Sequence, residues 1–146
     1  MKKITLWGFA LIISAFLANC KQPQTTISEM PQDYLFDKTW TLETFGEKKY
    51  LKASLQGVLN ISFALESRQV NGCAGCNRFF ANYTLKNGQL SIYDIGTTKK
   101  LCPAETMNVE TQMLKILGKA DNYDVSKETL RLKRGDKILA TFSLSK

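Results

Sequence analysis

Residues 70–80 read Val70-Asn71-Gly72-Cys73-Ala74-Gly75-Cys76-Asn77-Arg78-Phe79-Phe80. This run holds two of the four cysteines of the chain, and strand-like segments precede and follow it. Glycine permits positive φ and close backbone approach, and asparagine can hydrogen-bond nearby backbone groups in a turn. Cysteine packs as a small apolar group and can be cross-linked where the compartment is oxidising. These residue types predict a tight, covalently anchored crossing between two segments of a sheet.

The N-terminus has the pattern of a secretory signal. Met1-Lys2-Lys3 is basic, whereas residues 4–19 carry no charge and are mostly apolar. The apolar run is shorter than the ~20 residues that a membrane-spanning helix needs. A basic start followed by a short apolar segment is typical of a signal peptide, so we expect residues 1–19 to be one.

The end of this segment, Leu17-Ala18-Asn19-Cys20, resembles the bacterial lipobox. The resemblance implies that Cys20 carries acyl chains (palmitate among them) and becomes the first residue after cleavage. Asn19 departs from the pattern, in which Gly, Ala or Ser usually precedes the cysteine. Several acyl chains hold a protein at a membrane surface, because each buried CH₂ contributes ~0.8 kcal/mol. Residues 20–32 are polar with two prolines, which predicts a flexible tether, and residues 33–146 are long enough for one domain.

The composition excludes several classes of function. Hydrophobic residues at 44% and aromatic residues at 10% suffice for one core. The chain has no histidine, and histidine is both the commonest general base and the commonest metal ligand. Removal of residues 1–19 takes away Lys2 and Lys3 and no acid, which lowers the formal net charge from +7 to +5. The basic residues lie in short clusters among acids, so we expect a solvated surface and no nucleic-acid ligand.

Alternation with a period of two predicts antiparallel strands on both sides of the central run. The dipeptide Asn87-Gly88 between two such segments is a strong hairpin signal. Arg134-Gly135-Asp136 is interpreted in the same way, as a hairpin turn. The apolar residues that mark the predicted strands are Trp40 and Leu42, then Leu59, Ile61, Phe63 and Leu65, then Ala81, Tyr83 and Leu85, then Leu90 and Ile92, then Tyr123 and Val125, then Leu130 and Leu132, and finally Ile138, Ala140, Phe142 and Leu144.

One helix is predicted after Cys102-Pro103, since proline is tolerated in a first turn. The residues Val109, Met113, Ile116 and Leu117 form an apolar stripe at helical spacing, and Gly118 is suited to end the helix. A single helix among antiparallel strands indicates an α+β fold. We therefore predict a curved antiparallel sheet of about six to eight strands wrapped around a single helix.

The motifs together resemble the META domain of HslJ-like heat-shock lipoproteins. The resemblance covers about residues 37–144, from the opening Trp40-x-Leu42 to the last strand. It depends above all on a Gly-Cys-Asn-Arg-aromatic element followed by a threonine and a cysteine. The residues that match the motif are Gly72, Gly75, Cys76, Asn77, Arg78, Phe79, Tyr83 and Thr98, with Cys102 further along.

The resemblance implies a role in envelope stress tolerance, and no enzymatic activity is established for the family. We therefore expect a non-catalytic protein without cofactor or metal, which acts as a monomer and binds an unidentified envelope protein. Lys21 follows the lipobox cysteine, where the retention signal of the inner membrane would have Asp. By that comparison we expect the outer membrane, with the domain facing the periplasm.

The resemblance also implies a pairing of the cysteines. If Cys20 is lipidated, three thiols remain, and one is left over in an oxidising compartment. Cys76 and Cys102 match the family pattern, so a bridge between them is implied and Cys73 is the extra thiol. A loop of ~27 residues closed in this way stabilises the fold by about 3.5 kcal/mol in the chain-entropy model. Pairing of Cys73 with Cys102 or with Cys76 stays open.

Two alternative functions follow from the residues. Cys73-x-x-Cys76 with Cys102 predicts a thiol redox module or a copper-binding module. The spacing alone is weak evidence, because the residues after the motif indicate loop and strand where redox proteins have a helix. The second alternative is a carrier of a small apolar ligand, which requires a cavity between sheet and helix.

Overall fold

The computed structural model describes residues 31–49 and 58–146. The expected signal peptide, the lipidation site Cys20 and nearly all of the expected tether lie outside the described residues. A short 3₁₀ helix, η1, spans Pro31–Tyr34 and precedes the sheet. Leu35 follows it directly and is completely buried.

The described strands form one antiparallel sheet in the order β6-β5-β4-β3-β1-β9-β8-β7, and the two-residue β2 pairs with β1 beside this path. The sheet is open, its main path has eight strands, and α1 is the one α-helix in the described residues. The predicted α+β class, with an antiparallel sheet of about six to eight strands and a single helix, is confirmed. The bounds are β1 Thr39–Phe45, β2 Lys48–Lys49, β3 Asn60–Phe63, β4 Gln69–Cys73, β5 Arg78–Lys86, β6 Gln89–Thr97, α1 Ala104–Leu117, β7 Asn122–Val125, β8 Thr129–Arg134 and β9 Lys137–Leu144.

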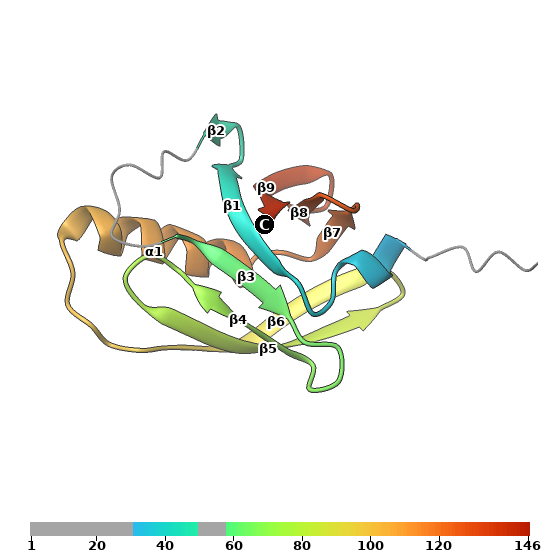
Figure 1. Cartoon of the computed structure of the whole chain (residues 1–146), viewed down its shortest axis with the longest axis horizontal. Helices are drawn as coiled ribbons and strands as arrows, with labels where there is room; N and C mark the ends of the chain where they lie inside the picture. Colours follow the sequence, from blue (N-terminus) through green and yellow to red (C-terminus); the bar gives the residue numbers. More distant parts are fainter. Residues whose placement is uncertain (1–30, 50–57) are drawn as a thin grey trace, which may run out of the picture.

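The core lies between the helix and the curved sheet (Figure 1). The helix contributes Met113, Ile116 and Leu117, which are the predicted apolar stripe apart from the half-buried Val109. The sheet contributes its alternating apolar residues, of which Trp40 and Tyr83 are the largest. Full burial of one such side chain stabilises the folded state by about 1.5–3 kcal/mol. The burial of the alternating apolar residues of the sheet against the helix therefore holds the two together.

Two residues of the predicted alternation face solvent. Leu65 is 42% exposed because β3 ends at Phe63 and the chain turns before β4. Ile138 is 39% exposed because the pairing of β8 with β9 shifts between Leu132 and Lys133. Lys133 points to the opposite face from Leu132, and Ile138 pairs with Lys133, so its side chain is turned outward.

Gly72 allows β4 to pack closely against β3 and β5. It pairs with Ile61 on one side and with Phe79 on the other. A Cβ atom at this position would overlap the carbonyl oxygen of Asn60 and would lie 2.9 Å from the ring of Phe79. Because the obstacle is backbone on one side and a buried ring on the other, neither neighbour can move away cheaply.

We expect Gly72→Ala to lower the free energy of unfolding by about 3 kcal/mol, because the added methyl forces β3 away from β4. Urea denaturation followed by circular dichroism measures the change. Gly118→Ala is the matched control, since its φ is −72° and its Cβ would meet atoms no closer than 3.7 Å. The control should be neutral or slightly stabilising, and equal effects of the two substitutions would contradict the close approach at Gly72.

Candidate functional site

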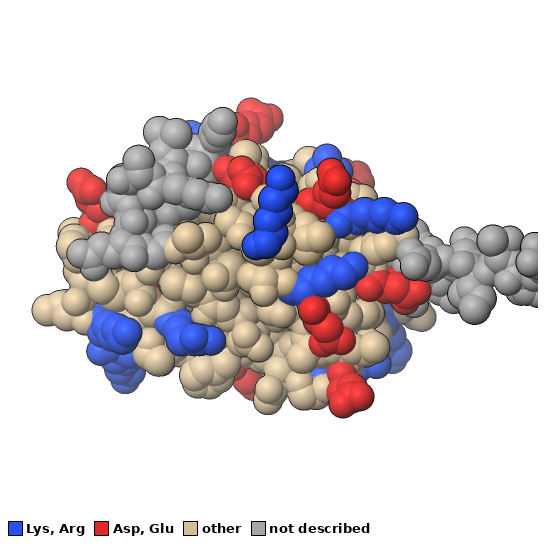
Figure 2. Space-filling model, in the orientation of Figure 1, with Lys and Arg blue, Asp and Glu red and all other residues tan. Residues whose placement is uncertain are grey.

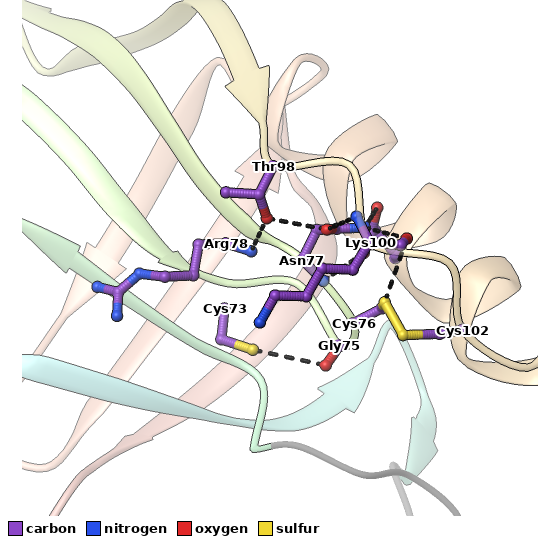
Figure 3. Close-up of a disulfide and its surroundings, with 9 residues drawn as sticks. Cys73, Gly75, Cys76, Asn77, Arg78, Thr98, Lys100 and Cys102 are labelled. Carbon is purple, nitrogen blue, oxygen red and sulfur yellow. Dashed lines mark hydrogen bonds between the residues drawn. A yellow bond between two sulfur atoms is a disulfide. The ribbon is translucent and has the colours of Figure 1, made fainter.

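Asn77 lies in the crossing between β4 and β5 and is almost completely buried, at 1% exposure. Its side-chain Nδ2 donates to Glu110 Oε1 at 3.1 Å and to the Lys100 carbonyl at 3.3 Å. Its Oδ1 accepts from the Thr98 hydroxyl at 2.8 Å and from the Lys100 N–H at 2.7 Å. All the hydrogen-bonding capacity of the amide is therefore used, and Asn77 joins the crossing to the segment before α1 (Figure 3).

Glu110 holds the same asparagine from the helix. Its Oε2 accepts the backbone N–H of Asn77 at 2.7 Å, and its Oε1 accepts from the Asn77 side chain. The carboxyl group is 5% exposed, and no Lys or Arg in the described part of the chain forms an ion pair with it. Hydrogen bonds to a carboxylate are stronger than neutral ones, so this pair is the main polar link between α1 and the sheet.

Sequence reasoning did not assign a role to Glu110. The signal was present, because Thr106, Glu110, Met113 and Leu117 follow one another at helical spacing and all are buried. An acid within the buried face of a helix needs a polar partner on the facing element. The position of Glu110 in the stripe therefore indicates that it has a buried polar partner, but it does not identify that partner as Asn77.

Cys76 and Cys102 are joined by a disulfide, with their Cα atoms 6.1 Å apart. This is the pairing that the family resemblance implies, and it ties the crossing to the residue before the N-cap of α1, Pro103. Cys73 is free and half-buried, and its thiol donates to the Gly75 carbonyl at 3.6 Å. The two alternative pairings of Cys73 are not formed in the structure, and the thiol lies beside the disulfide without joining it (Figure 3).

The other motif residues divide into two groups. Gly75 and Thr98 belong to the crossing. Gly75 has φ +128°, and a Cβ atom added to it would lie 3.4 Å from the carbonyl oxygen of Thr106 in α1. Thr98 accepts the N–H of Arg78 at 3.2 Å and donates to Asn77. The Arg78 side chain points outward and is exposed.

Phe79 and Tyr83 lie in the core. The Tyr83 hydroxyl donates to the Ala64 carbonyl at 2.9 Å, and its ring meets Phe63 edge-on at 5.2 Å. Burial raises the pKa of the Tyr83 phenol above its ordinary value, and the nearby Arg68 opposes that shift. Tyr83 therefore packs far along β5 from the crossing and is not part of the polar cluster.

The hydrogen bonds of the arrangement fix the backbone of the crossing and of the segment before α1. In residues 31–49 and 58–146, His, Cys, Asp and Glu side chains do not gather in any group of three or more that could hold a metal ion. In the same ranges no helix combines the length and the apolar character needed to cross a membrane. The crossing between β4 and β5 is held against α1 by a cluster of four residues, Asn77, Thr98, Lys100 and Glu110.

A double-mutant cycle between Asn77 and Glu110 should show coupling of about 1–3 kcal/mol. Glu110→Ala alone should lower the free energy of unfolding by about 2–4 kcal/mol, because it leaves two buried donors of Asn77 without an acceptor. Urea denaturation of the two single variants and the double variant measures both quantities.

Glu105→Ala is the matched control for this cycle. Glu105 lies on the same helix but is exposed, and none of the hydrogen bonds described above involves it. Its removal should change stability by no more than about 0.5 kcal/mol. Strict additivity of Asn77→Ala and Glu110→Ala would show that the two residues do not act as one unit.

Solved structures with the same fold are known. An NMR structure of a protein from Burkholderia xenovorans is 23% identical, with a TM-score of 0.64, over 86% of this chain and 97% of that one. The crystal structure of a DUF4847 family protein from Bacteroides vulgatus is 15% identical, with a TM-score of 0.55, over 77% of this chain and 95% of that one. At these identities the likeness establishes the fold alone. No curated protein matches the sequence.

The family model of the META domain matches residues 33–146. The matched range contains the crossing, the disulfide, the buried Glu110 and every strand that the structure describes. The chain therefore belongs to the META domain family.

Proposed function

We propose that this META domain protein is a lipid-anchored, non-catalytic protein of the cell envelope, which supports tolerance of envelope stress by binding another envelope protein. The observation that carries the proposal is the apolar N-terminal run that ends at Cys20, followed by a polar segment and then by the folded domain. Acylation of that cysteine would keep the domain at a membrane surface, in the outer membrane on the periplasmic side.

The disulfide supports an extracytoplasmic location. Disulfides persist in oxidising compartments such as the periplasm and are rare where thiols are kept reduced. Cys76 and Cys102 lie close together, because the crossing and the segment before α1 are also joined through Asn77. A domain cross-linked by a disulfide keeps its fold under conditions that unfold domains without one, which suits a role under stress.

The hydrogen bonding of the cluster supports a non-catalytic role. A general acid or base needs a lone pair or a proton that is available to a substrate. Both oxygens of Glu110 are occupied by Asn77, and the Asn77 amide is itself saturated. The cluster is also covered by the helix and the loop, with exposures of 5% for Glu110 and 1% for Asn77.

The two alternative functions receive less support. A redox couple between Cys73 and Cys76 would have to break the bond of Cys76 to Cys102, and the motif is followed by strand β5, which begins at Arg78, where redox proteins have a helix. A carrier needs space under the helix, whereas Met113 and Leu117 are completely buried against the sheet.

The anchor is tested by metabolic labelling with an alkyne-bearing palmitate, followed by fractionation of the envelope. The wild-type chain should take up label and sediment with membranes, because Cys20 is the expected acylation site. Cys20→Ser should lose the label entirely and should be recovered uncleaved, since the lipobox cysteine is required for processing.

Cys73→Ser is the matched control, because Cys73 is the cysteine in the described part of the chain that forms no disulfide. It should be labelled like the wild type. Label that persists in Cys20→Ser, or a wild-type chain that takes up none, would refute the anchor. Crosslinking of the wild-type protein in intact envelopes, with recovery of the same partner from independent preparations, tests the binding part of the proposal.

A further inference from the structure

One end of the molecule combines exposed apolar and basic side chains. Leu101 is 97% exposed, and the exposed Lys99 and Lys100 precede it. Arg78 and Phe80 of β5 continue this surface, and Phe80 is 58% exposed. Phe80 pairs with Gly96 of β6, and its ring occupies the space that a side chain at position 96 would fill. We call these five residues, Arg78, Phe80, Lys99, Lys100 and Leu101, the basic end.

The backbone of the basic end is fixed on both sides of its most exposed residue. The N–H of Lys100 donates to Asn77 and its carbonyl accepts from Asn77. Cys102, immediately after Leu101, is bound to Cys76. The N–H of Thr98 donates to the Arg78 carbonyl at 3.0 Å, which joins the segment to β5. A surface that is already ordered loses little conformational entropy when it binds, so a fully exposed leucine held in this way is suited to contact something outside the molecule.

The charges of the basic end are not neutralised within the described chain. None of Arg78, Lys99 and Lys100 forms an ion pair with any residue that the structure describes. Figure 2 shows Lys and Arg side chains gathered, without an acid between them, at the end where β5 begins and the segment to α1 passes. Basic residues of this kind are attracted to anionic lipid headgroups, and exposed apolar side chains between them can enter the headgroup layer.

We propose that the basic end docks on the surface of an anionic phospholipid bilayer, with Leu101 and Phe80 entering the interface. Leu101 directly follows two lysines and Phe80 lies two residues after Arg78, so each exposed apolar side chain has a cation near it along the chain. This combination fits a layer of phosphate headgroups over acyl chains better than it fits a protein partner with one contiguous apolar patch. The inference rests on the proposed lipid anchor, which would bring the domain to the bilayer.

The position of the basic end gives the docked domain an orientation. The 3₁₀ helix η1, where the described chain begins, lies at the opposite end of the molecule from the segment between β6 and α1 (Figure 1). Residues 21–31 can span at most about 40 Å between Cys20 and the domain. A tether of this length lets the domain turn its basic end toward the same bilayer that holds the lipid.

The test places a tryptophan at the proposed contact. The lipidated protein carrying Leu101→Trp is reconstituted in vesicles of phosphatidylcholine and phosphatidylglycerol with brominated acyl chains, and quenching of fluorescence is measured. Ile138→Trp is the matched control, because Ile138 is also an exposed apolar residue that follows a lysine, but it lies on β9. The buried Trp40 contributes a background that is subtracted with the wild type.

We expect the tryptophan at position 101 to be quenched several-fold more than that at position 138. The difference should disappear in phosphatidylcholine vesicles and when Lys99→Glu and Lys100→Glu are added to Leu101→Trp. Protein that floats with the vesicles but shows equal quenching at the two positions overturns the docking and leaves the anchor standing, and crosslinking of position 101 to a protein would then assign the surface to that partner. Protein that does not float with the vesicles overturns the anchor and the docking together.

Discussion

The structure depends on one buried pair, the Glu110 carboxylate and the Asn77 amide. A carboxylate at 5% exposure would be costly to bury without donors, and the only described residue that donates to it is Asn77, through its backbone N–H and its side chain. Asn77 in turn requires Glu110, because Asn77 is also buried and its donors need the acceptors that Glu110 supplies. The pair therefore sets where the helix can lie relative to the crossing between β4 and β5.

The remaining features of the crossing follow from that placement. Gly75 adopts a φ of +128°, which residues with a side chain rarely adopt, where the crossing faces Thr106 of α1. The other face of the Asn77 amide binds both backbone groups of Lys100 and the Thr98 hydroxyl, which brings Cys102 within bonding distance of Cys76. The disulfide is thus a second link along the same path as the hydrogen bonds. The links differ in kind, because the covalent one depends on an oxidising compartment and the hydrogen bonds do not.

The periodic parts of the molecule could be predicted from the sequence. Alternation located the long strands, the stripe of Met113, Ile116 and Leu117 located the helix, and Asn87-Gly88 located the hairpin between β5 and β6. The orientations of Leu65 and Ile138 could not be predicted, since they depend on where a strand stops and on a shift of register. The partnership of Asn77 with Glu110 was missed because the two residues are 33 positions apart, and alternation and helical spacing describe only near neighbours.

The central claim is that the Asn77–Glu110 pair holds the crossing on the helix independently of the disulfide. Native-state hydrogen exchange at the backbone amides of Asn77 and Lys100, measured after reduction of Cys76–Cys102, tests it most directly. The account predicts that both amides stay protected together with those of β5, because their acceptors are the Glu110 carboxylate and the Asn77 side chain. Exchange of the two amides at the rate of an exposed loop, while β5 stays protected, would contradict the account and make the disulfide the link on which the crossing depends.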